Sequence, residues 1–512
     1  MPEHIDAWRP KQEAALHLLS QSPKRVKALC MPTGSGKTAV YVADALRQKQ
    51  RPTCFVTDSR ALQDQLIEEF GPIGLVDIRG RSNYPCGMRP EDPDYTCEHG
   101  YASRCPMKGT HHCPASQSEM RAAASSLVVT NYDKWIHARR YGQGLAHIQR
   151  VVFDEGHEAP SALGRAMQVV LHQKEVEETL GIDFPPASDA LFFSTWRPWA
   201  AKARAVCELM MVSARTKLLD RQVKASWVRH FTHLRNLSRR LAILASANPN
   251  NWVVEELPRA YQFDPIAPAI YAESALLLKV MDITVISATL RPKTLYMMGI
   301  SHLNFEFEEF LSDFDPVRCP FYYVPTMQVD SRQSSLAPLW IMLDQIAARR
   351  RDRNGIVHTM SYIRRDDVLA HSRYAASMFV NERGEPATAM VDAFKASYPG
   401  SILVSPSVGQ GFDFAFKAAE WQFIAKVPFP PPSKILKART ELDKELPYYL
   451  AMQKLVQAAG RLMRAPTDQG ETIMGDDHLK WFLPRYAHLA PKSFGQFFQR
   501  IESLPTPPPR LP

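Results

Sequence analysis

Short apolar runs alternate with amphipathic stretches along the first part of the chain. The runs VKALCM (26–31) and TCFVT (53–57) have the length of buried strands, and each precedes a stretch with helical spacing of apolar residues. Two later runs, SLVVTN (126–131) and RVVFDE (150–155), continue the pattern. Strands that alternate with helices are typical of a parallel sheet, so we predict an α/β fold.

The alternation is interrupted twice. Residues 81–119 are rich in Pro, Gly, Cys and His without any period, and residues 161–260 are basic and largely helical in period. A buried strand returns at 281–290 (MDITVISATL), and runs such as NGIVHTM and SILVSPS indicate a second α/β unit. We therefore predict a first lobe from residues 1–80, 120–160 and 261–300, insertions at 81–119 and 161–260, and a second lobe at 301–512.

The composition is that of a globular protein with several domains. The 512 residues are 45% hydrophobic and 22% charged, and the net charge of +9 suits a polyanion such as nucleic acid. On charge alone, a basic protein without such a partner is an equally good interpretation. No apolar run approaches the ~20 residues that span a membrane, and no signal peptide is visible, so we expect a cytoplasmic protein without a membrane partner.

The sequence TGSGKT (Thr33–Thr38) lies between a predicted strand and a predicted helix. In such a loop the N–H groups of Gly34, Ser35 and Gly36 surround the β-phosphate of a nucleotide. Lys37 supplies positive charge to the β- and γ-phosphates, and the Thr38 hydroxyl reaches Mg²⁺. The loop therefore predicts ATP binding, with Mg²⁺ as the accompanying ion.

Acidic and basic partners for this loop follow later in the chain. In VVFDEGH, Asp154 suits Mg²⁺ and Glu155 suits the orientation and deprotonation of a water molecule, whereas His157 either relays between sites or packs. In QAAGRLMR, Arg461 and Arg464 are three residues apart and share a helix face. Such arginines stabilise charge on a γ-phosphate, although a solvated basic face gives the same pattern.

In this order the motifs resemble those of superfamily 2 DNA helicases, specifically the XPD/DinG group of iron–sulfur helicases. SATL (287–290) is similar to motif III, and DEGH stands where the family has DEAH. The resemblance implies two RecA-like parallel-sheet lobes, with the helical insertion in the place of the family's Arch domain. Its further site residues are Gln12 at the adenine, Gly411 and Asp413 of motif V at the nucleotide, and the catalytic Gln457, Arg461 and Arg464 of motif VI.

Four of the eight cysteines lie between the phosphate loop and the acidic motif. In the family, four cysteines at this place hold a [4Fe–4S] cluster, and the candidates here are Cys86, Cys97, Cys105 and Cys113. The intervening residues His99, His111 and His112 leave a zinc site with mixed ligands as an alternative, and unligated thiols as another. A segment of this length without periodicity buries too little apolar area to hold itself together, so we expect bound metal to stabilise it.

We therefore expect a monomeric, ATP-dependent helicase that moves on single-stranded DNA and unwinds forked duplexes. The family implies 5′→3′ movement, and RNA–DNA hybrids are further candidate substrates. The alternatives are a translocase that displaces proteins without separating strands, a zinc-stabilised variant, and a scaffold that binds ATP without hydrolysing it. Glu155 argues against the scaffold, because simple binding needs no general base.

Overall fold

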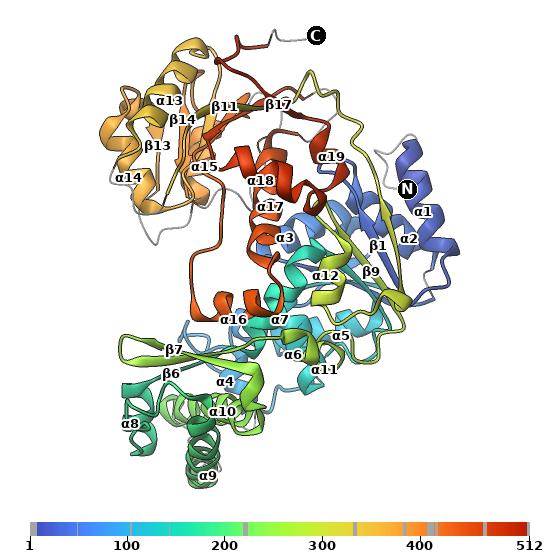
Figure 1. The fold of residues 1–512 in the computed structure, drawn as a ribbon. Helices are drawn as coiled ribbons and strands as arrows, with labels where there is room; N and C mark the ends of the chain where they lie inside the picture. The colour runs from blue at the N-terminus through green and yellow to red at the C-terminus, as the bar shows by residue number, and fades with distance from the viewer. Residues whose placement is uncertain are drawn as a thin grey trace.

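Two α/β lobes, each built on a seven-stranded parallel sheet, form the body of the molecule (Figure 1). The computed structural model describes residues 8–48, 50–102, 105–142, 144–218, 224–330, 335–381, 387–406, 414, 418–463 and 468–508. Both lobes have the RecA-like arrangement predicted from the sequence. No helix within these residues is long and apolar enough to cross a membrane.

The sheet of lobe 1 has the order β10-β1-β9-β5-β2-β4-β3. Its strands are β1 (Val26–Cys30), β2 (Thr53–Thr57), β3 (Leu75–Asp77), β4 (Leu127–Asn131), β5 (Arg150–Asp154), β9 (Asp282–Ser287) and β10 (Phe305–Glu309). Its helices are α1 (Pro10–Gln21), α2 (Lys37–Arg47), α3 (Arg60–Phe70), α6 (Tyr132–Tyr141), α7 (Ala159–Met167), α11 (Ala272–Ala275) and α12 (Pro292–Met297). The predicted strands at 26–31, 53–57, 126–131, 150–155 and 281–290 are therefore confirmed.

Strand β10 corrects one predicted boundary. We placed the end of lobe 1 at residue 300, but β10 pairs with β1 from Phe305 to Glu309, so the first sheet extends to residue 309. Its sequence FEFEE alternates between half-buried and exposed positions, as expected of an edge strand. Such a strand lacks the continuous apolar run from which the central strands were predicted.

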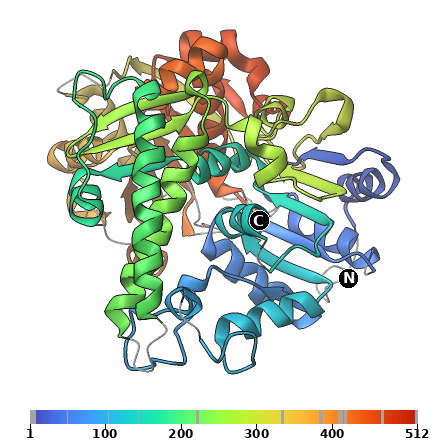
Figure 2. The same ribbon diagram turned by 90° about the horizontal axis from the view of Figure 1, so that it is seen from below.

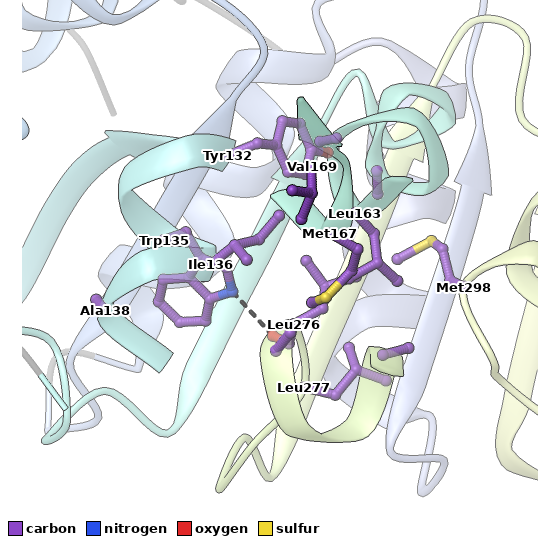
Figure 3. Close-up of a cluster of buried hydrophobic side chains, with 14 of the residues drawn as sticks. Tyr132, Trp135, Ile136, Ala138, Leu163, Met167, Val169, Leu276, Leu277 and Met298 are labelled. Carbon is purple, nitrogen blue, oxygen red and sulfur yellow. Dashed lines mark hydrogen bonds between the residues drawn. The ribbon is translucent and has the colours of Figure 1, made fainter. Parts of the chain in front are cut away.

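A large apolar cluster holds the helices of lobe 1 against the sheet (Figure 3). Tyr132, Trp135 and Ile136 of α6 are buried together with Leu276 and Met298, which lie far along the chain. The indole of Trp135 also donates a hydrogen bond of 2.9 Å to the carbonyl of Leu276. Burying one such side chain contributes ~1.5–3 kcal/mol to stability. Because the cluster contains residues from both chain segments of lobe 1, it joins them into one core.

The sheet of lobe 2 has the order β13-β14-β12-β15-β16-β11-β17. Its strands are β11 (Phe321–Met327), β12 (Gly355–His358), β13 (Met378–Phe379), β14 (Ile402–Ser405), β15 (Trp421–Ile424), β16 (Glu471–Asp476) and β17 (Phe498–Arg500). Its helices are α13 (Ala337–Arg349), α14 (Tyr362–His371), α15 (Thr388–Lys395), α16 (Lys434–Leu442), α17 (Leu446–Ala459), α18 (Leu479–Tyr486) and α19 (Lys492–Gly495).

The second insertion contains a helical hairpin and a small antiparallel sheet. Helices α9 (Phe193–Lys217) and α10 (Ala225–Ser246) lie side by side (Figure 2). Helix α8 (Gln173–Leu180) and the strands β6 (Val169–His172), β7 (Trp252–Leu257) and β8 (Ala260–Pro265) complete the arch, as we call Val169–Pro265. The sheet, in the order β6-β8-β7, was not predicted, and β8 extends past the expected boundary at residue 260.

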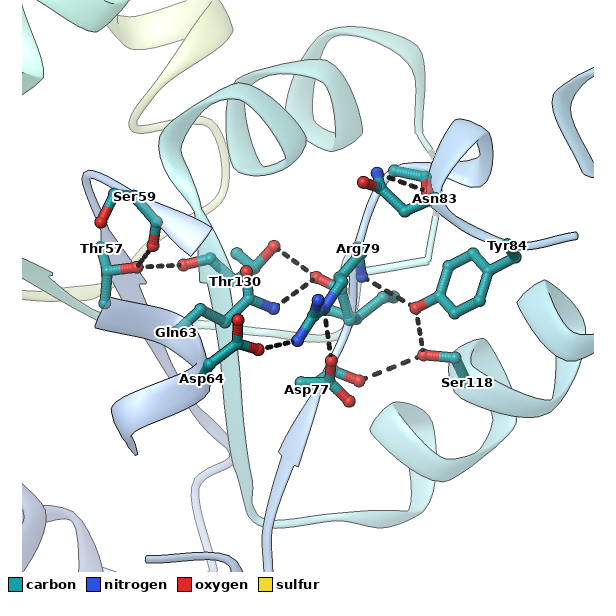
Figure 4. Close-up of polar contacts among 12 residues, drawn as sticks. Thr57, Ser59, Gln63, Asp64, Asp77, Arg79, Asn83, Tyr84, Ser118 and Thr130 are labelled. Carbon is teal, nitrogen blue, oxygen red and sulfur yellow. Dashed lines mark hydrogen bonds and ion pairs between the residues drawn. The ribbon is translucent and has the colours of Figure 1, made fainter. Parts of the chain in front are cut away.

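The first insertion, residues 81–119, is called the cysteine insertion here. It leaves the sheet after β3 and includes α4 (Cys97–Ala102) and the first part of α5 (Pro114–Ala124). Polar contacts fix its base to lobe 1 (Figure 4). The hydroxyl of Tyr84 accepts a hydrogen bond from the N–H of Arg79 (3.0 Å) and lies 2.9 Å from Oγ of Ser118, which donates to the carbonyl of Asp77.

Candidate functional site

The phosphate loop lies at the carboxyl end of β1, directly before α2. Gly34 and Gly36 have φ angles of 72° and 76°, in the left-handed region that favours glycine. Ser35 closes the turn, because its N–H and its hydroxyl both donate to the carbonyl of Pro32, at 3.3 and 2.7 Å. Helix α2 begins at Lys37, so the N–H groups of its first turn face the end of the loop. This arrangement favours a bound phosphate.

Gln12 lies against this loop and is buried. Its amide donates to the carbonyl of Ser35 (3.0 Å) and accepts from the N–H of Arg9 (3.0 Å). A Cβ on Gly36 would lie 2.4 Å from Nε2 of Gln12, so only glycine permits this contact. Gln12 therefore braces the phosphate loop, and its contact with adenine remains a prediction.

Asp154 ends β5 beside the first turn of α2. The hydroxyl of Tyr41 donates to Asp154 (3.3 Å) and also contacts the side chain of Thr38, so both predicted Mg²⁺ ligands border one hydroxyl. Burial and the neighbouring charge of Glu155 raise the pKa of Asp154 to about 6. A divalent cation would favour the ionised carboxylate here, and oxygen ligands suit Mg²⁺.

Glu155 has an unusual backbone for a residue with a side chain. Its φ of 46° lies in the left-handed region, and its N–H donates to Oδ1 of Asp154 (3.0 Å). Burial alone would raise the pKa of Glu155, but the hydrogen bond with His157 and the charge of Lys37 lower it well below its usual range. Glu155 is therefore ionised, and 32% of its side chain is exposed. A general base must be ionised and must reach water, so both features suit the role predicted for Glu155.

His157 joins the acidic motif to both neighbouring motifs. Its Nδ1 lies 2.7 Å from Oγ of Ser287, and that hydroxyl donates to Glu155 (3.2 Å). On the other side, Nε2 of His157 contacts the amide of Gln457 from lobe 2. Burial would lower the pKa of His157, but the carboxylates of Glu155 and Glu158 outweigh it and raise that pKa to about 9. These contacts join His157 to both lobes, and its role as a relay stays a prediction.

Motif VI approaches the phosphate loop closely. A Cβ on Gly460 would lie 2.9 Å from Oγ1 of Thr33, so glycine lets the two lobes meet at this point. The adjacent Arg461 is close enough that its charge helps to lower the pKa of Glu155. The predicted site residues Arg464, Gly411 and Asp413 lie outside the residues that the structure describes.

The glycine of DEGH has a local explanation. A Cβ on Gly156 would lie only 2.4 Å from Cγ1 of Val285 in β9, and 3.5 Å from the backbone nitrogen of Ile286. An alanine at this position therefore requires β9 to shift. Because β9 leads into SATL, Gly156 sets how closely motifs II and III pack.

The four predicted cysteine ligands line one cavity. Cys86, Cys97, Cys105 and Cys113 all border a cavity of about 330 Å³ that also includes Tyr101 and Lys108. The Sγ atoms of Cys97 and Cys113 are 3.8 Å apart, and Cys86 and Cys105 both lie next to Gly100. Among the described residues, no three His, Cys, Asp or Glu side chains are arranged to hold a single metal ion. The donor set, four thiols around a space larger than one ion, fits a multi-atom cluster.

Two functional side chains had weak sequence signals. Ser287 belongs to the recognised SATL motif, but no spacing rule predicted its contact with His157. Tyr41 lies four residues after Lys37, one helical turn along α2, and nothing in the sequence marks it as a neighbour of Asp154.

Residues 5–182 match the family described as "Type III restriction enzyme, res subunit", and residues 347–497 match "Helicase C-terminal domain". No curated protein matches the sequence significantly. The solved structure XPD_Helicase is similar over 97% of this chain and 100% of its own, at 14% identity and a TM-score of 0.64. XPD_APO covers 96% and 100% at 14% identity, and S. tokodaii Xpd4 covers 96% and 98% at 13% identity, both with a TM-score of 0.60.

The two family matches together span more than half of the chain and fall on its two lobes. The solved structures add the fold, and their similarity covers almost the whole length of the chain. The chain thus belongs to the superfamily 2 helicases, as an ATP-dependent member with the XPD-like fold.

Proposed function

We propose that this helicase moves along single-stranded DNA in the 5′→3′ direction and separates forked duplexes, with a [4Fe–4S] cluster in the cysteine insertion. The observation that carries the proposal is the contact between His157 of lobe 1 and Gln457 of lobe 2. Together with the close approach of Gly460 to Thr33, it supports a nucleotide site shared by the acidic motif, the phosphate loop and motif VI. A nucleotide held there contacts both lobes and biases their relative position.

The residues divide the work of ATP hydrolysis. Lys37 and the loop N–H groups bind the phosphates, while Thr38 and Asp154 hold Mg²⁺, which neutralises charge on the phosphate oxygens. Glu155 orients the attacking water and accepts its proton. Arg461, together with Arg464, stabilises the charge that develops on the γ-phosphate. The short path from Glu155 through Ser287 to His157 supports a link between hydrolysis and the interface of the lobes.

A basic surface supports nucleic acid as the partner. A cavity of about 400 Å³ lies among lobe 1, the cysteine insertion and the arch, and its lining includes Arg60, Lys134 and Arg239. Burial and the nearby Arg239, Lys134 and Arg81 lower the pKa of His137 in this lining to about 4. The lining has five basic side chains against three acidic ones, Asp58, Glu98 and Asp133, and this net positive charge favours an anionic strand. DNA and the direction of movement rest on the resemblance to the XPD/DinG group, and RNA–DNA hybrids are the second substrate to test.

The resemblance to the XPD/DinG group implies a cluster, and the cysteine cavity has room for one. The four thiols border a cavity of about 330 Å³, larger than a single ion requires. The separation of 3.8 Å between the Sγ atoms of Cys97 and Cys113 also suits two ligands of one zinc ion with Zn–S distances of about 2.3 Å, so the metal assay decides between cluster and zinc. The cluster acts through shape, because the thiolates would fix α4 and the start of α5 relative to lobe 1.

The test uses anaerobically purified protein, with iron, acid-labile sulfide and zinc measured together. We expect iron and sulfide in equal amounts, ATPase activity that rises with single-stranded DNA, and unwinding only of forks with a free 5′ arm. Zinc without sulfide would contradict the cluster. ATPase without fork separation would favour the translocase, and nucleotide binding without turnover would favour the scaffold.

A further inference from the structure

Helix α16 belongs to lobe 2 in sequence but lies away from its sheet. After β15 the chain runs through the proline-rich segment PFPPPS (428–433) and begins α16 at Lys434, capped by the hydroxyl of Ser433. Figure 1 shows α16 beside β7 of the arch, and the two elements are in contact. Proline-rich segments are semi-rigid spacers, so the segment holds α16 at this distance from lobe 2.

Arg439 of α16 binds the end of the arch sheet. Its Nε and Nη2 donate to the carbonyls of Ile266 (3.1 Å) and Pro265 (2.9 Å), at the end of β8 where the strand ladder stops. Burial lowers the pKa of Arg439, and the charge of Asp264 acts against this effect. Hydrogen bonds from a partly desolvated guanidinium are strong and directional, so Arg439 fixes α16 to β8.

Lobe 1 meets the same junction. A Cβ on Gly164 of α7, the helix that follows the acidic motif, would lie 3.5 Å from Nη2 of Arg439. Gln168, directly after α7, donates to Asp264 (2.7 Å). Lys434 adds a second contact from α16 to the arch, at 3.3 Å from the carbonyl of Val254 in β7. The arch, lobe 1 and lobe 2 therefore converge on Arg439.

A rigid element connects this junction to the nucleotide site. Helix α17 follows α16 after a short turn, and its 14 residues span ~21 Å. Its far end carries Gln457, which contacts His157, and leads directly into Gly460 and Arg461. Asp443, in the turn between the two helices, pairs with Lys293 of lobe 1 (2.8 Å). This ion pair attaches the junction of α16 and α17 to lobe 1, so that the two helices can turn about it.

We propose that α16 and α17 form a lever that transmits nucleotide-dependent movement of motif VI to the arch, with Arg439 as the positioning residue that holds the arch to it. The proposal rests on the proposed function, because it needs ATP to bind between the lobes. Nucleotide that fixes Gln457 and Arg461 also fixes the α16 end of the rod, and through Arg439 it fixes β7 and β8. Without Arg439, α16 keeps its contact through Lys434 but loses the end of β8, so β7 and β8 follow the ATP cycle more weakly.

Hydrogen–deuterium exchange of the full-length protein tests the lever. We compare Arg439→Ala, the milder Arg439→Lys, and the control Lys437→Ala, whose side chain is exposed on the same helix. A non-hydrolysable ATP analogue with Mg²⁺ should slow amide exchange in both the phosphate loop and β7–β8 of the native protein and of Lys437→Ala. In Arg439→Ala the slowing should remain in the phosphate loop and fall by about tenfold in β7–β8, since two charge-assisted hydrogen bonds are lost.

Activity supplies a second measurement. Arg439→Ala should keep basal ATPase within about twofold of the native rate and lose about tenfold in fork separation, with Arg439→Lys between the two. Equal slowing of β7–β8 in the native protein and in Arg439→Ala would overturn the lever. The lever would also be overturned if, in the native protein, the analogue slowed amide exchange in the phosphate loop but not in β7–β8. If the phosphate loop itself does not respond, the proposed function fails, and the lever fails with it.

Discussion

The sheet of lobe 1 and the cysteine insertion lie side by side but are stabilised differently. Every residue of β1, β2 and β5 is buried, and helices cover the sheet with a continuous apolar core. Among the described residues of the insertion, the buried apolar side chains are Cys86, Tyr95, Cys97 and Ala115. Two of these four are thiols that line the cavity.

The sheet of lobe 1 is thus stable by its own packing, whereas we expect the insertion to be stable only with help from bound metal and neighbouring residues. Apolar burial contributes about 25 cal/mol per Å², so the sheet needs no ligand to persist, whereas the insertion buries too little to order itself. Contacts with its neighbours hold the insertion, such as the ion pair between Asp92 and Arg229 of α10, and we propose that metal bound by its thiols adds to them. Substitutions in the two regions should therefore change different measured properties of the protein.

The largest effect should follow from substituting the predicted catalytic residues at the ends of the lobe 1 strands, which leaves the apolar core of the sheet unchanged. Glu155→Gln removes the general base and should lower ATP turnover by about 10²–10⁴-fold while ATP still binds. Lys37→Ala should instead weaken ATP binding as well, because it removes charge from the phosphates. Steady-state ATPase and nucleotide titrations measure both. Native turnover by Glu155→Gln would show that another group is the base.

The second effect isolates the insertion. Cys105→Ser removes one thiolate and should release the bound metal, abolish fork separation, and leave nucleotide binding and much of the basal ATPase intact. Hydrogen exchange should rise within 81–119 and stay native in the sheet of lobe 1. Cys207→Ser is the matched control, because Cys207 is buried in the arch, where its thiol donates to the carbonyl of Leu234, away from the cysteine cavity. Fork separation at the native rate by Cys105→Ser would remove any role for the insertion in separating strands.

The third prediction concerns His157, which contacts both lobes, and the change of the free energy of unfolding with pH. Because the folded pKa of His157, about 9, exceeds its unfolded value near 6.5, its charge stabilises the fold fully below pH 6.5. That contribution is lost as pH rises from 6.5 to 9. Denaturant unfolding with EDTA should show the advantage of the native protein over His157→Gln shrinking by roughly 2–3 kcal/mol between pH 6 and pH 9.5. A constant difference would mean that folding does not change the pKa of His157.

The smallest effect should come from packing between motifs II and III. Gly156→Ala places a methyl group against Val285 and should cost about 1–2 kcal/mol in the free energy of unfolding. Val285→Ala opens the space that the new methyl group needs, so the double variant should recover part of this loss. Thermal melts of the single and double variants measure the coupling. Purely additive losses would show that the two side chains do not compete for space.

Local pattern explains which parts of the structure could be predicted. The central strands were found because both of their faces are buried, so each appears as a continuous apolar run. Strands β6, β7 and β8 were missed because several of their residues are only half-buried, and because β6 pairs with β8, which is distant in sequence. In the site, Lys37 and Glu155 are marked by motifs, whereas the contacts of Ser287, Tyr41 and Arg439 depend on tertiary placement that no spacing encodes.

The left-handed backbone of Glu155 sets an evolutionary constraint. A glutamate in this conformation costs stability that asparagine, which adopts it more readily, would recover. Selection for thermal stability alone would therefore favour replacing the proposed general base. Libraries of this protein screened only for stability should lose glutamate at this position, whereas libraries screened for ATP turnover should retain it.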